Sequence, residues 1–252
     1  MIDISLYLLF FLLGLIIGSF LNVLIIRLPK GESVVFGRSK CPKCKKTLSA
    51  WELIPVLSYI FLSGRCKNCR KTISIQYPLV ELSSGLLFVL FYYLFGLNYL
   101  LVFYLLFVAA AIVIFVYDTK YLEIPEIFSW ILLVLALVIG IWQSSFPFSN
   151  FLLGGLIGGG ILGILVGVSN EKLMGSGDIK IGLAFGFLLG YPRALLFLLL
   201  SFMIGAIVGV IMMLFSDKKL KSEVAFAPFM IIAGIIVLIW GDTIINSYLS
   251  LI

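Results

Sequence analysis

Histidine is absent from this 252-residue chain, and charged residues make up only 12% of it. Without histidine, Ser-His-Asp and Cys-His catalytic schemes and histidine-ligated metal sites are excluded. The low charge, together with a 62% hydrophobic content, leaves more apolar surface than a soluble domain could cover. The sequence therefore predicts a polytopic membrane protein whose chemistry depends on Asp, Glu or Cys.

Long apolar runs predict the fold class, an all-α membrane protein with about eight transmembrane helices. The first run, 4–26, follows Asp3 and lacks a basic start and a small-residue cleavage site, so we expect a retained helix rather than a signal peptide. The run 179–190 is short for a full crossing, so it is expected to be re-entrant, to lie in a thinned bilayer or to draw Asp178 into the membrane. The other predicted spans are 78–95, 99–117, 127–142, 151–169, 194–215 and 225–240.

All four cysteines lie in one polar, lysine-rich segment, residues 27–77. Their C-x2-C, x21, C-x2-C spacing is typical of a structural zinc site, and four thiolates would close a tetrahedral shell with no position left for water. Two disulfides are the alternative, but the basic character of the segment favours a reducing, cytosolic location. The predicted domains are a first helix (1–26), a zinc-binding domain (27–77) and a membrane core (78–252). The predicted ligands are Cys41, Cys44, Cys66 and Cys69.

Basic residues fall on one side of the predicted topology. With the N-terminus outside and eight crossings, every Lys and Arg except Arg193 lies in an inside segment, as the positive-inside rule requires. The net charge of +6 is then an orientation signal, and with few aromatic residues among the basic ones we predict no nucleic-acid partner. The inside residues are eleven in 27–77, followed by Lys120, Lys172, Lys180, Lys218, Lys219 and Lys221.

Two aspartates follow this topology to the same membrane face. Asp118 comes directly after the apolar run 99–117, and Asp178 lies between two glycines and the run 179–190. Capping of the helix that begins at Ile179 is the structural alternative for Asp178. Two carboxylates at one site cannot both ionise cheaply, so such a pair is expected to share a proton. A shared proton is the arrangement of aspartic proteases, in which one Asp activates water and the other, protonated, hydrogen-bonds the scissile carbonyl.

Glycines are predicted to have two roles. Gly175 and Gly177, beside Asp178, are expected to permit positive φ and close approach of an extended substrate. Gly14 and Gly18 form a small-x-x-x-small pair, which predicts close helix packing. The same packing role is expected for a glycine-rich run that comprises Gly154, Gly155, Gly158, Gly159, Gly160, Gly163 and Gly167.

The chain resembles the type IV prepilin peptidases, whose GxGD motif is shared in outline with presenilin-type aspartyl proteases. Glu126 stands where Asn or Asp is usual after Ile-Pro, and Ala227 stands where Gly is common. The resemblance rests, in order, on Gly18-Ser19-Phe20-Leu21-Asn22-Val23, Arg27-Leu28-Pro29, the cysteine quartet, Tyr77-Pro78-Leu79-Val80-Glu81, Asp118 with Ile124-Pro125, and Gly175-x-Gly177-Asp178-x-Lys180.

The resemblance implies a membrane aspartyl endopeptidase of the prokaryotic inner membrane that serves type IV pili and protein secretion. Asp118 and Asp178 would be the catalytic pair, cleaving the leader of prepilin or pseudopilin substrates at the cytosolic face. The motif residues that would support this pair are Gly175, Gly177, Lys180, Ile124 and Pro125.

The resemblance also implies N-methylation of the new terminus with S-adenosylmethionine, although no Gly-rich cofactor fingerprint is present. Glu81, Asn22 and Arg27 are the residues of interest for this activity, with interfacial anchoring as the alternative role. A rival from another class is a carrier or pilus-assembly scaffold that uses the two aspartates to bind a cation or proton. A carrier would be expected to hold its acids near the bilayer midplane, whereas both acids here lie at span ends.

Overall fold

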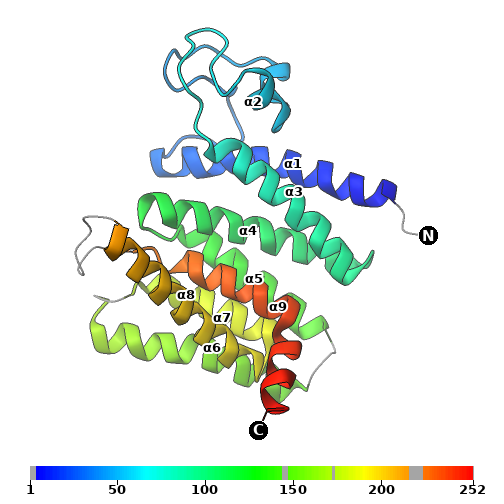
Figure 1. Cartoon of the computed structure of the whole chain (residues 1–252), viewed down its shortest axis with the longest axis vertical. Coiled ribbons are helices and arrows are strands. Elements are labelled where there is room, and N and C mark those ends of the chain that lie inside the picture. Colours follow the sequence, from blue (N-terminus) through cyan, green and yellow to red (C-terminus); the bar gives the residue numbers. More distant parts are fainter. Residues whose placement is uncertain (1–3, 144–146, 172–173, 216–223, 252) are drawn as a thin grey trace. The chain divides into compact units, whose positions relative to one another are not determined.

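The computed structural model describes residues 4–143, 147–171, 174–215 and 224–251. It forms two compact units, Met1–Val113 and Ile114–Ile252. Figure 1 shows that the regular elements of the described part are helices. They are α1 (Ile4–Arg27), η1 (Leu28–Lys30), η2 (Ala50–Leu53), α2 (Leu57–Phe61), α3 (Gln76–Phe95), α4 (Tyr99–Tyr121), α5 (Glu126–Trp142), α6 (Phe148–Ser169), α7 (Ser176–Leu189), α8 (Arg193–Phe215) and α9 (Ala227–Leu249).

Each predicted apolar run forms a helix, which confirms the all-α membrane class. Six of them, α1, α3, α4, α6, α8 and α9, are long and apolar enough to cross a bilayer, and α5 is a shorter apolar helix. A helix satisfies its own backbone hydrogen bonds, which is why apolar segments in lipid adopt this form. Four of the lysines used for the predicted orientation, Lys172, Lys218, Lys219 and Lys221, lie outside the described residues.

The first unit is built on the packing of α1 against α3. At Gly14, an added Cβ would lie 2.6 Å from the Cα of Gly85, and at Gly18 it would lie 2.7 Å from the Cα of Glu81. Only glycine allows the two backbones to approach this closely, so the predicted packing role of the Gly14/Gly18 pair is confirmed. This contact fixes the ends of both helices from which the polar segment extends.

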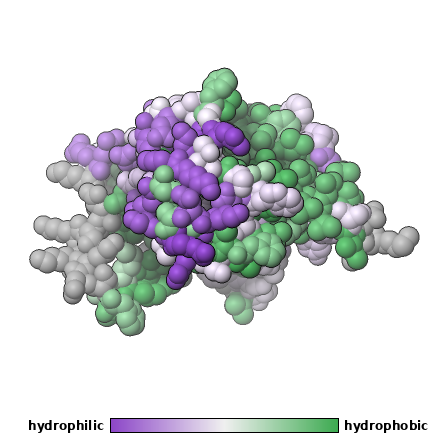
Figure 2. Space-filling model, turned by 90° about the horizontal axis from the view of Figure 1, so that it is seen from above, coloured by the Kyte–Doolittle hydropathy of each residue, from purple (hydrophilic) through white to green (hydrophobic). Residues whose placement is uncertain are grey.

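The polar segment between α1 and α3 contains only short helices, joined by loops and two isolated β-bridges. Figure 2 shows that hydrophilic residues gather in one part of the visible surface. Several large apolar side chains of the segment are exposed nevertheless, among them Phe36, Trp51 and Phe61. The tertiary structure thus holds a polar domain against the ends of two membrane helices.

The second unit is organised around α7, which packs against α5, α6, α8 and α9. Its buried residues, including Gly182, Ala184 and Phe185, lie on more than one face of the helix. Because neighbouring helices enclose it, a helix of 14 residues needs no lipid-facing length of its own. This enclosure explains how the short run 179–190 is stable as a helix.

Glycines allow α6 and α7 to pack in close contact. A Cβ at Gly158 would lie 2.3 Å from the carbonyl oxygen of Gly182, and one at Gly154 would lie 2.4 Å from that of Gly186. The predicted packing role of the glycine-rich run is therefore correct for its first four members, Gly154, Gly155, Gly158 and Gly159. The rest of the run was predicted wrongly, because open space surrounds Gly160, Gly163 and Gly167.

Helix ends differ from the sequence-based expectation at both aspartates. Helix α4 continues to Tyr121, so Asp118 lies in its last turns rather than after it, and Leu122 ends it at a φ of 57°. Helix α7 begins at Ser176, so Asp178 lies within its first turn instead of preceding it. Apolar periodicity underestimates the length of a helix whose terminal turns are polar. Such turns are stabilised by tertiary hydrogen bonds and capping rather than by apolar burial.

The glycine contact gives a matched pair of substitutions on α6. Gly158→Ala is expected to lower the thermal unfolding temperature in detergent, since the new methyl meets a backbone oxygen that moves only if the helices separate, at about 1–3 kcal/mol. Gly163→Ala, in open space, should be neutral or stabilising by up to about 1 kcal/mol. Equal unfolding temperatures for the two variants would contradict the close α6–α7 contact.

Candidate functional site

Asp118 is buried near the end of α4, with 5% of its surface exposed. Its Oδ2 atom accepts a hydrogen bond of 3.2 Å from the backbone N–H of Ala227, the first residue of α9. The first N–H groups of a helix have no partner within the helix and carry its positive dipole, so they hold a carboxylate well. The start of α9, 109 residues further along the chain, therefore holds the Asp118 side chain in place.

Asp178 is also 5% exposed and lies in the first turn of α7. Its Oδ2 atom accepts the N–H of Gly175 at 3.2 Å, so the predicted capping role exists, although for a helix that starts at Ser176 rather than Ile179. Its Oδ1 atom is buried and has no hydrogen-bond partner among the described residues. Asp178 and Asp118 are both buried and both lie in the second unit. One oxygen of Asp178 therefore caps α7, and the other has no partner among the described residues.

Gly177 brings the two motif segments together. A Cβ at this position would lie 2.9 Å from the side chain of Ile124, so only glycine permits this contact. The expected positive φ is wrong for both glycines: Gly175 has a φ of −81°, and neither it nor Gly177 is among the described residues with positive φ. Gly177 is therefore needed for side-chain packing that holds the segment after α4 against the start of α7.

Lys180 forms a cluster with two residues of α5. Its Nζ atom lies 2.9 Å from Oε1 of Glu126 and 4.7 Å above the ring centre of Trp130. Pro125 is the N-cap of α5. One signal in the sequence indicates this ion pair: Glu126, an acid with a longer side chain, replaces the usual Asn or Asp. No sequence pattern indicated the contact with Trp130.

The four cysteines form a cluster in the first unit, with all four Sγ atoms within 4.8 Å of one another. The Sγ atoms of Cys41 and Cys69 are 3.9 Å apart, close to the separation of about 3.8 Å that tetrahedral Zn–S bonds of about 2.3 Å require. None of the four is in a disulfide. The backbone N–H of Lys46 lowers the pKa of the Cys44 thiol to about 6, which favours the thiolate that binds metal. The cluster could therefore hold zinc.

The cluster consists of two copies of one turn. Cys41 N–H donates to the oxygen of Lys46, and Cys66 N–H donates to the oxygen of Lys71, both at 2.9 Å. The bridge between Lys40 and Thr47 likewise recurs between Arg65 and Thr72. The repeat is visible in the sequence as KCPKCKKT at 40–47 and RCKNCRKT at 65–72. Two equal turns present two thiols each, which is how a metal site with four sulfur ligands is assembled.

The structure gives different roles to the three residues of interest for methylation. Asn22 donates to the carbonyl oxygens of Gly18 and Tyr77, and so joins α1 to the start of α3. The guanidinium of Arg27 donates to four backbone oxygens, those of Ser33, Phe36, Gly37 and Arg38, and so holds the loop that leads to Cys41. Glu81, 7% exposed, accepts the N–H of Val56 at 2.7 Å. Asn22 and Arg27 thus have structural roles, because their side chains bind backbone oxygens of neighbouring segments.

Two known families match successive parts of the chain. The bacterial peptidase A24 N-terminal domain matches residues 12–95, which include the cysteine segment. The type IV leader peptidase family matches residues 103–210, which include both aspartates. No solved structure matches the chain significantly.

Curated relatives match the chain over nearly its full length. A prepilin leader peptidase/N-methyltransferase of Pseudomonas aeruginosa is 31% identical, over 95% of this chain and 92% of its own length. One from Bacillus subtilis is 32% identical, over 96% of this chain and 97% of its own length. One from Neisseria gonorrhoeae is 30% identical, over 92% of this chain and 90% of its own length.

Proposed function

Because this chain belongs to the type IV leader peptidase family, we propose that it cleaves the leader of prepilin or pseudopilin substrates and then methylates the new terminal amine. The observation that carries the peptidase assignment is the buried, unpartnered Oδ1 of Asp178, in the same unit as the buried carboxylate of Asp118. A buried acceptor without a partner is costly, and a functional site is where such a cost is retained. A proton shared with Asp118, or a bound water, would satisfy this oxygen.

The proposed mechanism uses these two carboxylates as an acid–base pair. The ionised carboxylate takes a proton from water as the water attacks the scissile carbonyl, and the protonated one donates a hydrogen bond to the carbonyl oxygen. The N–H groups of Ala227 and Gly175 each hold one oxygen, which leaves the other oxygen of each acid for water and substrate. Packing of Ile124 on Gly177 keeps the two segments aligned.

We propose an orientation in the prokaryotic inner membrane with the N-terminus outside and both the cysteine segment and the aspartates on the cytosolic side. The basic residues of 27–77, together with Lys120 and Lys180, support this orientation by the positive-inside rule. Asp118 and Asp178 lie in terminal turns of their helices, which favours a peptidase over a carrier with acids near the midplane. Cleavage would then occur where the leader meets the hydrophobic stretch of the substrate.

We further propose that zinc bound to Cys41, Cys44, Cys66 and Cys69 has a structural role, and that S-adenosylmethionine is the methyl donor. Four sulfur ligands leave no open position on zinc, so the cysteine cluster supports the fold rather than the chemistry. When bound, S-adenosylmethionine supplies a methyl group attached to a positively charged sulfur. The lipid bilayer and the prepilin-like substrate are the proposed partners.

Leader cleavage is expected to have a bell-shaped pH profile, because the pair is active only when it holds one proton. At low pH both carboxyl groups are protonated and no base remains, and at high pH both are ionised and no donor remains. The measurement is cleavage of a synthetic pilin leader peptide across pH in nanodiscs, with and without a chelator. A profile with a single limb, or cleavage lost to the chelator while the cysteine zinc stays bound, would indicate a metalloenzyme instead.

A further inference from the structure

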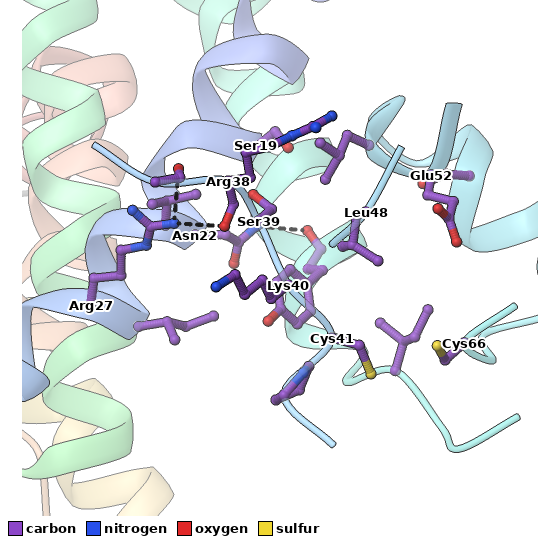
Figure 3. Close-up of a pocket in the computed structure, with 18 of the residues that line it drawn as sticks. Ser19, Asn22, Arg27, Arg38, Ser39, Lys40, Cys41, Leu48, Glu52 and Cys66 are labelled. Atoms are coloured by element: carbon purple, nitrogen blue, oxygen red, sulfur yellow. Dashed lines mark hydrogen bonds between the residues drawn. The ribbon is translucent and has the colours of Figure 1, made fainter. Parts of the chain in front are cut away.

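A cavity of about 610 Å³ lies in the first unit, between the ends of α1 and α3 and the cysteine segment. Figure 3 shows Asn22 and Arg27 of α1 on one side of it and Cys41 and Cys66 on another. Small-molecule and cofactor sites have volumes of roughly 300–1,000 Å³. The cavity therefore has the size of a site for a nucleoside-containing ligand, and its walls contain neither of the two aspartates.

The wall of this cavity contains a buried carboxylate, that of Glu81. One of its oxygens accepts the N–H of Val56, and the Ser19 side chain also hydrogen-bonds the carboxylate. Val56 has a φ of 59°, and Leu57 N–H donates to the oxygen of Pro55 at 2.6 Å, which closes a tight γ-turn. This conformation is strained for a β-branched residue, and such strain is retained mainly at functional sites.

Three other polar groups around the cavity, those of Asn22, Arg27 and Glu52, are committed to the fold. Asn22 and Arg27 bind backbone carbonyls, and Glu52 accepts from both the N–H and the hydroxyl of Ser49. Glu32 is exposed. Glu81 therefore supplies the buried negative charge of the cavity wall. A carboxylate in such a wall attracts a positive ligand more strongly than one in water does.

We propose that this cavity binds the sulfonium methyl donor and that the Glu81 carboxylate faces the positive charge of the reactants. The inference rests on the methyltransferase half of the proposed function and assigns that activity a place. A donor of the S-adenosylmethionine class carries three features: a sulfonium, a purine and a carboxylate. In the cavity wall, the acid Glu81 suits the sulfonium, and the rings of Phe36, Tyr59 and Tyr77 suit the purine. Lysines such as Lys40 and Lys45 suit the carboxylate of the donor.

The transfer that this site would support balances without a further reactant. The lone pair of the neutral terminal amine forms the new N–CH3 bond, while the electrons of the broken S–CH3 bond remain on sulfur as a neutral thioether. The proton released from the nitrogen passes to water. The contribution of Glu81 is to attract and orient positively charged groups, and no covalent bond to the protein is formed.

Binding of radiolabelled S-adenosylmethionine to the zinc-loaded full chain in nanodiscs, measured by equilibrium dialysis, tests the site directly. Glu81→Gln keeps an acceptor for Val56 N–H but removes the charge, and it is expected to weaken binding about tenfold or more. Ser58→Trp, which fills the cavity from α2, should abolish binding. Glu171→Gln, an exposed acid outside the cavity, is the matched control and should bind the donor as the unmodified chain does.

Zinc content and leader cleavage are measured on the same preparations, and both should stay unchanged in Glu81→Gln. Unchanged donor affinity in both Glu81→Gln and Ser58→Trp would overturn the cavity assignment while leaving the proposed function standing. If the unmodified chain neither bound the donor nor methylated a cleaved peptide, the methyltransferase half of the proposed function would fail, and the cavity assignment with it. If Ser58→Trp lost zinc, donor affinity in Glu81→Gln alone would decide: weaker binding would support the cavity assignment, and unchanged binding would overturn it.

Discussion

Asp118→Asn and Asp178→Asn are each expected to lower leader cleavage on the order of 10³-fold or more, because each removes one member of an acid–base pair. Asn retains a side-chain oxygen that can accept the N–H of Ala227 or of Gly175. The variants should therefore stay folded and inserted, with unchanged thermal unfolding. The measurement is initial cleavage rate on a pilin leader peptide, taken with an unfolding curve for each variant.

Asp242→Asn is the matched control for these variants. It makes the same acid-to-amide change at an exposed residue of α9 that pairs with Arg193. An exposed pair contributes only about 0–1 kcal/mol, so cleavage should be nearly normal. Near-normal cleavage by Asp178→Asn would mean that Asp178 serves α7 only as a cap. If Asp118→Asn also cleaved normally, the carrier or scaffold would become the better hypothesis.

The aspartate variants also separate the two proposed activities. Because the cavity beside Glu81 contains neither aspartate, both Asn variants are expected to bind the methyl donor and to methylate a peptide that begins at the cleaved terminus. Loss of both activities in a folded Asn variant would contradict this separation.

Cys41→Ser is expected to remove one zinc per chain and to loosen the segment from Lys40 to Ile73. Structural zinc sites provide about 10–16 kcal/mol of apparent binding energy, far more than the few short hydrogen-bonded turns of this segment could replace. Serine is a poor ligand for zinc in a sulfur site, so a tetrahedral shell would be left with three ligands. The measurements are elemental analysis and limited proteolysis of the segment under reducing conditions.

Lys43→Ala is the control for zinc, since Lys43 lies between two ligands and contributes none itself. It should keep full zinc content and the same proteolysis pattern. We expect cleavage of leader peptide to fall less in Cys41→Ser than in the Asn variants, because the cluster belongs to the first unit and the aspartates to the second. Protein purified with no zinc, four reactive thiols and a protected segment would refute the metal site.

Sequence patterns that repeat locally predicted the fold well. Apolar runs identified the membrane helices, and the C-x2-C pairs identified a cluster that the fold does assemble. Both succeed because the physical cause lies within one short stretch of chain: a span must satisfy its own backbone, and a tight turn presents its own two thiols. Helix termini at Tyr121 and Ser176 were missed because polar terminal turns depend on partners elsewhere in the chain.

The sequence by itself determined the membrane class, the zinc-type cysteine pattern, the two candidate aspartates and the family resemblance. Only the tertiary structure decided which groups hold those aspartates, because the hydrogen bond from the N–H of Ala227 to Asp118 joins residues 109 positions apart. It likewise decided that Gly177 serves contact with Ile124 rather than positive φ. It also decided that Glu81 and Arg27 line the same cavity, in which the Arg27 side chain binds a loop. Such roles depend on distances between segments far apart in the chain, and residue spacing along a single chain does not encode those distances.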